Sequence, residues 1–192
     1  MSKIGLIIPT RHEFNLIEDE IKCETEYQIC GMGKVNAAIA ASNLISIFEC
    51  EKILLVGFAG GLRGLDKGDI IEPSEFIEGD FHAEELEVQY PNSFSQQSFL
   101  NLGRKVPIVT QDRFLKEDIY ERTILTPVLA CDMESYAVAK VCQAHDVEFY
   151  CVRIISDIAD EFAERDFSKP NQHLIEVFQS TLRKAMQCLE SQ

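Results

Sequence analysis

Stretches of consecutive apolar residues alternate along this chain with segments in which apolar residues recur every three or four positions. Consecutive apolar residues bounded by Gly or Pro are typical of buried β-strands. The predicted strands lie within residues 3–8, 26–33, 52–61, 68–81, 106–114 and 147–156. Pro73 interrupts the fourth segment, which therefore forms either one strand or two.

Helical spacing is clearest near the C-terminal end. The apolar face of a predicted helix there comprises Leu174, Val177, Phe178, Thr181, Leu182, Ala185 and Leu189. Further helices are predicted at 34–48, which is rich in Ala and lacks Gly and Pro, and at 134–146, and another begins after Thr10. Residues 85–104 are polar and rich in turn formers, so they are expected to form an exposed loop.

Strands that alternate with helices predict an α/β fold. Because the strand segments are apolar throughout, helices should cover both faces of the sheet. In such sheets ligands bind at the carboxyl ends of the strands. Glu13, residues 58–61, Phe114 and Asp157 all come just past predicted strands, so they are the first candidates for a binding site.

The composition narrows the function without defining it. The chain has 192 residues, of which 46% are hydrophobic and 26% charged, as expected for one globular domain. Its 18 Lys and Arg residues against 32 Asp and Glu residues give a net charge of −14, which argues against a nucleic-acid partner. A small anionic ligand is not excluded, because local hydrogen-bond donors decide that.

Nothing in the sequence suggests a membrane, a secreted protein or a metal. The apolar runs are shorter than the roughly 20 residues of a spanning helix, and the N-terminal run is too short for a signal peptide. The seven cysteines include no C-x-x-C pair, which favours reduced thiols in a cytoplasmic protein. The four histidines lack metal-ligand spacing, so we expect no metal and no cofactor.

Glu13 has two interpretations. Thr10 and Glu13 have the T-x-x-E spacing of a capping box, in which Glu13 would bond the Thr10 amide. A carboxylate just past the first strand of an α/β sheet could equally be a general base. The spacing alone favours the cap.

Two glycine-rich turns also have a structural and a functional interpretation. Residues 31–34 join a strand to a helix, and their amides could approach an anion, but the complete phosphate-binding motifs are missing. Residues 57–62 follow a strand, and their glycines allow either a close approach to a ligand or a positive φ.

Two carboxylate-bearing segments lie close together in sequence. Asp132 and Glu134 flank Met133 where a helix is expected to start, so they could simply favour its N-terminus while Met133 fills the core. Alternatively, a glutamate there could bind a vicinal diol such as that of ribose. Asp157 ends a strand and could be an acid of raised pKa or a helix cap, and Asp160 could cap the next segment.

Taken together, these segments resemble the purine nucleoside phosphorylase/nucleosidase family, and within it most closely the bacterial 5′-methylthioadenosine/S-adenosylhomocysteine nucleosidases. The matching stretches, in family order, are KIGLIIPTRHE, GMGKVNAA, GFAGGL, GDI, TQDRF, DMESYAVAKVC and VRIISDIAD. The resemblance implies a three-layer α/β/α fold around a mixed sheet, formed by residues 1–192 as a single domain. It also implies a homodimer.

The resemblance implies a catalytic pair in one pocket. Glu13 would orient and activate the attacking water. Asp157, positioned by Ser156, would donate a proton towards purine N7. Asp132 would be a charge at the start of a helix.

The resemblance also implies a set of substrate-binding residues. Glu134 would bind the 2′- and 3′-hydroxyls, and Met133 would pack on the sugar. Phe114 would stack on the base, while the backbone of Leu115 reads its edge. The remaining implied site residues are Arg153, which would support the site, and Phe58, Ala59 and Gly60, which would border the substrate.

The chain departs from this branch in specific places. Phe58 stands where a small hydroxyl residue is common, Asp132 stands where Glu is usual, and residues 76–81 lack a common His-Asp pair. The chain is also shorter than most members, apparently within 85–105 and before Asp132. These differences bear on the substrate and the oligomeric state.

The predicted function is therefore that of a purine nucleoside N-glycosidase, which would hydrolyse nucleosides like 5′-methylthioadenosine and S-adenosylhomocysteine. Three alternatives stay open at this point: a futalosine hydrolase, a phosphate-dependent phosphorylase, and a catalytically idle nucleoside-binding or storage protein. A phosphorylase would need arginines around the phosphate, and only Arg11 and Arg63 lie near suitable turns.

Overall fold

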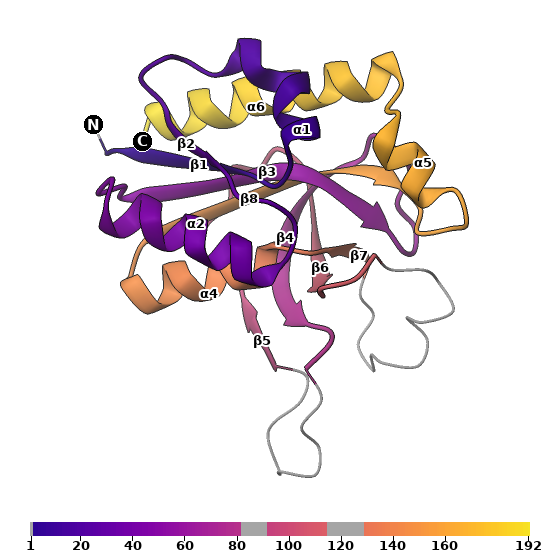
Figure 1. Ribbon diagram of the computed structural model, residues 1–192, viewed down its shortest axis with the longest axis horizontal. Helices are drawn as coiled ribbons and strands as arrows, with labels where there is room; N and C mark the ends of the chain where they lie inside the picture. The colour runs from indigo at the N-terminus through magenta and orange to yellow at the C-terminus, as the bar shows by residue number, and fades with distance from the viewer. Residues whose placement is uncertain (1, 82–91, 115–128) are drawn as a thin grey trace.

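A computed structural model describes residues 2–81, 92–114 and 129–192 (Figure 1). The strands are β1 (Ile4–Ile8), β2 (Glu26–Ile29), β3 (Lys52–Gly61), β4 (Ile70–Glu78), β5 (Asn92–Ser95), β6 (Arg104–Thr110), β7 (Ala130–Asp132) and β8 (Glu148–Asp157). The helices are α1 (Arg11–Ile17), α2 (Lys34–Ser46), α4 (Ser135–His145), α5 (Ala163–Ser168) and α6 (Gln172–Glu190), and a 3₁₀ turn spans Glu18–Glu20.

All described strands belong to one mixed sheet, as predicted. β1 pairs in parallel with β2 and β3, and β3 pairs in parallel with β8. β8 then pairs antiparallel with β4, β4 pairs in parallel with β6, β6 pairs in parallel with β7, and β7 returns antiparallel to β3. The pairings therefore lead from β3 through β8, β4, β6 and β7 back to β3, so these five strands close into a ring.

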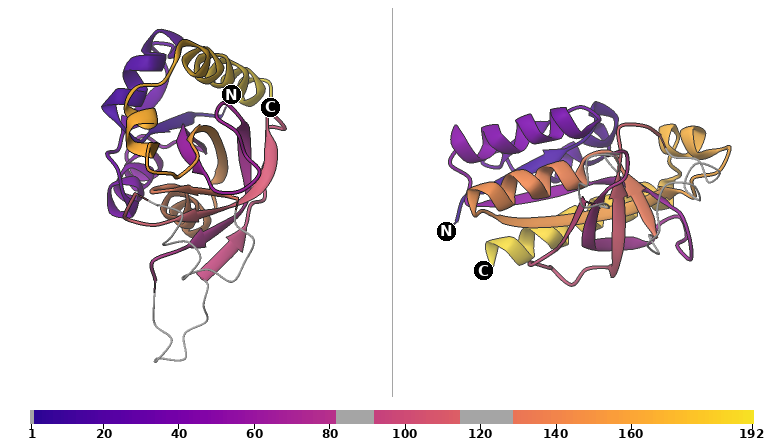
Figure 2. Two further views of the ribbon diagram at one scale, coloured as in Figure 1. Left: turned by 90° about the vertical axis from the view of Figure 1, so that its right-hand side faces the viewer. Right: turned by 90° about the horizontal axis from the view of Figure 1, so that it is seen from below.

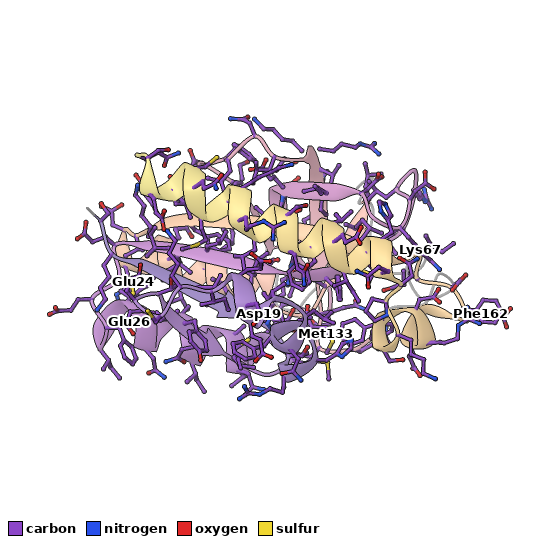
Figure 3. All side chains as sticks on the ribbon, turned by 90° about the horizontal axis from the view of Figure 1, so that it is seen from above. Asp19, Glu24, Glu26, Lys67, Met133 and Phe162 are labelled. Atoms are coloured by element: carbon purple, nitrogen blue, oxygen red, sulfur yellow. The ribbon has the colours of Figure 1, made fainter. Side chains whose placement is uncertain are left out.

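Helices cover both faces of the sheet, which confirms the three-layer α/β/α prediction (Figures 1 and 2). α2 and α4 pack together on one face, and α1 and α6 lie on the other, where α6 crosses the sheet (Figure 3). The core between the layers includes β3, all ten residues of which are buried. The predicted apolar face of α6 is confirmed, with Leu174, Phe178, Leu182, Ala185 and Leu189 buried.

The prediction of an exposed loop at 85–104 is wrong for residues 92–95, which form β5, whereas residues 96–103 contain no helix or strand. Residues 82–91 lie outside the described residues, but β5 pairs antiparallel with β4. Phe94 from β5 packs against Phe76 with ring centroids 5.6 Å apart, and Leu100 is buried. The polar composition of this segment did not indicate a strand, because only one face of β5 contacts the core and its other residues are polar.

Several element boundaries also differ from the sequence prediction. Asp132 ends the short strand β7, and α4 begins at Ser135 rather than at Glu134. The strand predicted at 106–114 ends at Thr110, and the helix α5 was not predicted. Pro73 lies inside a single strand, β4, and the pairing of β4 with β6 shifts its register between Pro73 and Glu75. In the described part of the chain, no helix has the length and apolar character needed to cross a membrane.

Glu72 of β4 holds the segment that leads from β5 into β6. Its buried carboxylate accepts hydrogen bonds from the amides of Leu100 at 2.6 Å, Leu102 at 2.6 Å and Gly103 at 3.1 Å. A single side chain thus accepts hydrogen bonds from three backbone amides that lie outside the β-strands and have no partner in the sheet.

We expect Glu72→Ala to lower the free energy of unfolding by roughly 2 kcal/mol or more, because it leaves these amides without acceptors. Urea unfolding measures the change. Glu75→Ala is the matched control, since Glu75 lies on the same strand and accepts one hydrogen bond from Ser93. Equal losses in the two variants would contradict this role of Glu72.

Candidate active site

A pocket opens at the carboxyl ends of β3 and β8, beside α1, the end of β7 and α5. Four carboxylates line it, those of Glu13, Asp132, Glu134 and Asp157. Its apolar wall comprises Pro9, Met32, Phe58, Phe114, Met133 and Phe167. Ala59, Gly60 and Ser156 also line it.

The structure thus brings most of the predicted site residues into one pocket. Arg153 lies behind the lining, where it contacts Glu134. Leu115 lies outside the described residues.

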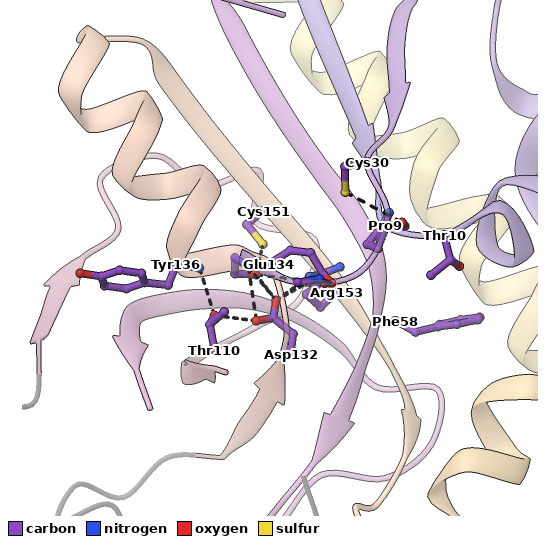
Figure 4. Close-up of polar contacts among 12 residues, drawn as sticks. Pro9, Thr10, Cys30, Phe58, Thr110, Asp132, Glu134, Tyr136, Cys151 and Arg153 are labelled. Carbon is purple, nitrogen blue, oxygen red and sulfur yellow. Dashed lines mark hydrogen bonds and ion pairs between the residues drawn. The ribbon is translucent and has the colours of Figure 1, made fainter. Parts of the chain in front are cut away.

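Arg153 joins two of these carboxylates. Its side chain is fully buried, and its Nε and Nη2 donate to Asp132 Oδ2 at 3.0 and 2.5 Å (Figure 4). Nη2 also donates to Glu134 Oε2 at 2.9 Å. Burial by itself would lower the pKa of Arg153, but Asp132 and Glu134 outweigh burial and raise it, so the guanidinium stays charged. Nη1 has no hydrogen-bond partner among the residues that the structure describes.

Asp132 is both a helix-start residue and an ion-pair partner. Its carboxylate accepts the Ser135 amide at 3.2 Å, which confirms the predicted contact with the first turn of α4. It also accepts the hydroxyl groups of Thr110, at 2.6 Å, and of Ser135. Sequence reasoning missed Thr110 and the pairing with Arg153, because these partners come from other strands.

Glu134 is held by donors from two different layers. Oε2 accepts from Arg153, and Oε1 accepts the Gly33 amide at 3.1 Å, just before α2. Its side chain makes no capping bond to α4, so the helix-cap explanation does not account for it. Burial, partly opposed by Arg153 and reinforced by Asp132, raises the pKa of Glu134 to about 7.

Glu13 takes part in the cap of α1 and also lines the pocket. Its amide donates to Thr10 Oγ1 at 3.1 Å, as in a capping box. Its buried carboxylate accepts the Thr10 hydroxyl at 2.6 Å and the Phe58 amide at 2.7 Å. Burial raises the pKa of Glu13, although these two hydrogen bonds and Arg153 oppose the change.

Gly57 and Gly60 lie within β3 rather than in a turn after a strand, and close packing of side chains requires both. A Cβ at Gly57 would lie 2.7 Å from both Arg153 Nη1 and Glu13 Oε1. A Cβ at Gly60 would lie 2.8 Å from Cys131 Sγ and 3.2 Å from Asp157 Oδ1. Neither glycine has a positive φ, so glycine is required at these positions because a side chain would not fit, and not because of the backbone conformation.

Asp157 lies at the end of β8 and is 3% exposed. Ser156 Oγ donates to its Oδ2 at 2.7 Å, and the Ala159 amide donates to its Oδ1 at 3.0 Å. Burial raises the pKa of Asp157 despite these two donors. Asp160 is not among the described residues that line the pocket, and its carboxylate accepts the Phe162 amide at 2.9 Å. The N-cap residue of α5 is Phe162, so the predicted capping role of Asp160 is not confirmed.

Aromatic rings close one side of the pocket. The ring of Phe167 on α5 lies 6.1 Å from that of Phe58, 6.3 Å from that of Phe114 and 5.8 Å from that of His12, measured between centroids. Phe58 also packs on Phe178 of α6 at 4.9 Å. Sequence reasoning missed Phe167, because α5 is too short to show a helical period.

Among the described residues, no group of three or more His, Cys, Asp or Glu side chains is placed to hold a metal ion. The acidic groups that line the pocket are buried carboxylates, and the two that flank Met133, Asp132 and Glu134, both pair with Arg153.

We expect Asp157→Asn to become more stable relative to the natural chain as the pH rises from about 4 to 7. A carboxyl whose folded pKa is raised stabilises the fold below its unfolded pKa of about 3.9 and loses this contribution as the pH rises through the folded value. Asn stays neutral and avoids that loss. Urea unfolding across this range measures the difference, and a difference that falls with pH would contradict the raised pKa.

Comparison with known proteins agrees with this architecture. The family model of the phosphorylase superfamily matches residues 6–191. The 5′-methylthioadenosine/S-adenosylhomocysteine nucleosidase of Thermotoga maritima is 31% identical over 147 residues, which cover 72% of this chain and 68% of that protein.

Two solved structures share the fold at low sequence identity. The 5′-methylthioadenosine/S-adenosylhomocysteine nucleosidase of Neisseria meningitidis, in complex with methylthio-immucillin-A, has a TM-score of 0.83 at 22% identity and covers 100% of both chains. Futalosine hydrolase of Helicobacter pylori has a TM-score of 0.77 at 20% identity and covers 99% of this chain and 96% of its own. Because the family model spans nearly the whole sequence, the chain belongs to the phosphorylase superfamily.

Proposed function

We propose that this protein is a purine nucleoside N-glycosidase that hydrolyses the N-ribosidic bond of nucleosides like 5′-methylthioadenosine and S-adenosylhomocysteine. The products would be a free base and a ribose derivative. The observation that carries the proposal is that Glu13 and Asp157 are both buried carboxylates of raised pKa in one pocket, which Glu134 also lines. The similarity to nucleosidases supports the substrate class.

Cleavage of an N-ribosidic bond places positive charge on the sugar and negative charge on the departing base. A proton delivered to purine N7 makes the base a better leaving group. Asp157 is suited to this step, because burial raises its pKa, which favours the protonated form, and Ser156 and Ala159 fix its orientation. Glu13, in its ionised form, would stabilise the sugar cation and direct water to it.

Glu134 is suited to hold the ribose diol. Each oxygen of a carboxylate can accept two hydrogen bonds, and each oxygen of Glu134 has accepted one, from Gly33 or from Arg153. One acceptor position on each oxygen is therefore left for the 2′- and 3′-hydroxyls. Met133 would pack against the sugar and Phe114 against the base, with the backbone of Leu115 at the base edge.

The described part of the pocket favours water over phosphate as the nucleophile. Arg113, which is exposed, is the only Lys or Arg among the described residues that line it. The guanidinium of Arg11 instead lies over the ring of Phe14, 5.1 Å from its centroid. Two donors of Arg153 are committed to carboxylates, and the apolar ring of Phe58 borders the pocket next to Glu13.

We expect the natural chain to release free base from methylthioadenosine without phosphate, and Asp157→Asn to lower turnover by about 10²-fold or more while ligand binding is kept. Chromatography of the base and calorimetric titration of a substrate analogue measure the two effects. Asp160→Asn is the matched control, because Asp160 lies three residues away and bonds only the Phe162 amide.

Futalosine, S-adenosylhomocysteine, adenosine and inosine complete the substrate panel. Release from futalosine alone would replace the proposed substrate with that of a futalosine hydrolase. Release only with phosphate would indicate a phosphorylase. Binding without any release would show an idle nucleoside-binding protein, and full activity in Asp157→Asn would exclude Asp157 as the acid.

We also propose that the chain forms a homodimer, as the family resemblance implies. Val35 and Ile39 lie one turn apart on α2 and are 69% and 55% exposed, and Ile47 at its end is 68% exposed. Met32, which lines the pocket, is 53% exposed beside them. Apolar side chains gathered in this way are typical of an interface.

Light scattering should give a mass of about twice the 21.8 kDa of one chain. Ile39→Glu should shift the protein to the mass of one chain, since a charge would then be buried without a partner. A natural chain that stays monomeric at all concentrations would contradict the homodimer.

A further inference from the structure

Three residues beside the pocket form a closed ring of hydrogen bonds, although they are far apart in sequence. Lys34 Nζ donates to Asp80 Oδ1 at 2.5 Å. The other carboxylate oxygen of Asp80 accepts the Asp112 amide at 2.8 Å. Asp112 Oδ1 then accepts the backbone amide of Lys34 at 2.7 Å, which completes the ring. Lys34 Nζ is also bonded to Glu78 at 2.9 Å.

The ring ties together three segments, and those of Lys34 and Asp112 border the pocket. Lys34 is the first residue of α2, and the preceding amide, that of Gly33, donates to Glu134. Asp112 comes after β6 and is followed by Arg113 and Phe114, which line the pocket. Asp80 comes after β4 and contributes no side chain to the pocket lining, so among the described residues it serves as a brace for the other two segments.

The ring of hydrogen bonds requires glycine at position 33, because a side chain there would crowd Asp112. The φ of Gly33 is 99°, which other residues rarely adopt, and a Cβ there would lie 3.1 Å from Asp112 Oδ1. The Asp112 carboxylate therefore packs directly on the Gly33 backbone. The backbone against which Asp112 packs is thus the one whose amide donates to Glu134.

The ring is partly protected from water, which strengthens its ionic contact. The side chains of Lys34 and Glu78 are 18% and 17% exposed, and that of Asp80 is 33% exposed. Burial alone would lower the pKa of Lys34, but the bonds to Asp80 and Glu78 raise it. The lysine is thus charged at neutral pH, where it attracts both carboxylates.

We propose that Lys34 is a positioning residue, which through Asp80 and Asp112 holds the Gly33 amide on Glu134 and fixes the Phe114 segment against the base. The expected effect of Lys34 on turnover rests on the proposed function. Its expected effect on the ionisation of Glu134 can be measured without a substrate. None of the three ring residues was predicted from the sequence as a site residue, although Lys34 and Asp112 lie within the matching stretches GMGKVNAA and TQDRF.

A change in this hydrogen bond would alter how Glu134 ionises. The charged groups around Glu134 are Arg153 from β8, Asp132 from β7 and Glu13 from α1, and the thiol of Cys30 lies near it after β2. Of these, only Arg153 favours the ionised form, and the Gly33 amide adds to its effect. Losing the amide would therefore raise the pKa of Glu134.

The test compares Lys34→Met with the natural chain in two measurements. In isotope-labelled protein, the amide resonance of Gly33 should titrate with Glu134, and the variant should lose most of this titration. With methylthioadenosine as substrate, kcat/KM should fall by roughly 10- to 100-fold, mainly through KM, and the acidic limb of its pH profile should move to higher pH. Lys34→Arg should restore both properties.

Lys22→Met is the matched control. Lys22 Nζ bonds both oxygens of Glu190, at 2.6 and 2.8 Å, away from the pocket-lining residues. This control should keep the natural titration and the natural kinetics. Lys34→Met should lose more thermal stability than Lys22→Met, because Lys34 is 18% exposed and makes two ion pairs, whereas Lys22 is 53% exposed and makes one with Glu190.

An unchanged Gly33 titration in Lys34→Met would overturn the inference, as would kinetics equal to those of Lys22→Met in an active enzyme. If Lys34→Met does not fold, Asp80→Asn opens the ring at the next contact, and its Gly33 titration decides in the same way. If the natural chain releases no base, the proposed function fails, while the titration still decides the role of Lys34.

Discussion

A single buried guanidinium organises this pocket. Arg153 has no exposed surface, and a charge so placed is tolerated only when partners of opposite charge compensate for its lost hydration. Asp132 and Glu134 provide that compensation, and Glu13 lies close enough for its charge to contribute. Burial is the main cause of the raised pKa values of Glu13 and Glu134, and at Glu134 the negative charges of Asp132 and Glu13 add to it. Other features follow from the need to hold these groups in place: the glycine at 57, the Thr110 hydroxyl on Asp132, and the Gly33 amide on Glu134.

Much of this arrangement could be predicted from local sequence. The strands at 52–61 and 147–156 are long apolar runs buried on both faces, and α6 carries an uninterrupted helical period, so the pattern of each reflects its packing directly. The carboxylates Glu13 and Asp157 could be placed near a pocket, because side chains at the carboxyl ends of neighbouring strands meet at one edge of a sheet. Their assignment to one pocket with Glu134 needed the family resemblance, since each spacing had an adequate explanation as a helix cap.

The rest depended on contacts between segments that are distant in sequence. β7 has three residues and β5 has four, too few to show an alternating pattern, and both exist because neighbouring strands offer them pairing partners. Phe167 lies on a six-residue helix, so only the tertiary structure reveals that its ring meets Phe58 and Phe114. Asp132 resembles a helix-start charge in sequence, and its second role becomes visible only when β8 places Arg153 beside it. The contact between Phe58 and Glu13 could not be predicted from the residue type either, because it is the backbone amide of Phe58 that donates to Glu13.

The central claim is that these carboxylates direct a water molecule to the ribose of a purine nucleoside. The most direct measurement is to run the reaction in water enriched in heavy oxygen and to determine the mass of the sugar product. The account predicts that the sugar carries the heavy oxygen while the released base does not, because water attacks the sugar and the carbon–nitrogen bond breaks. A sugar without the label, or one recovered as a phosphate ester, would contradict water as the nucleophile and the role assigned to Glu13.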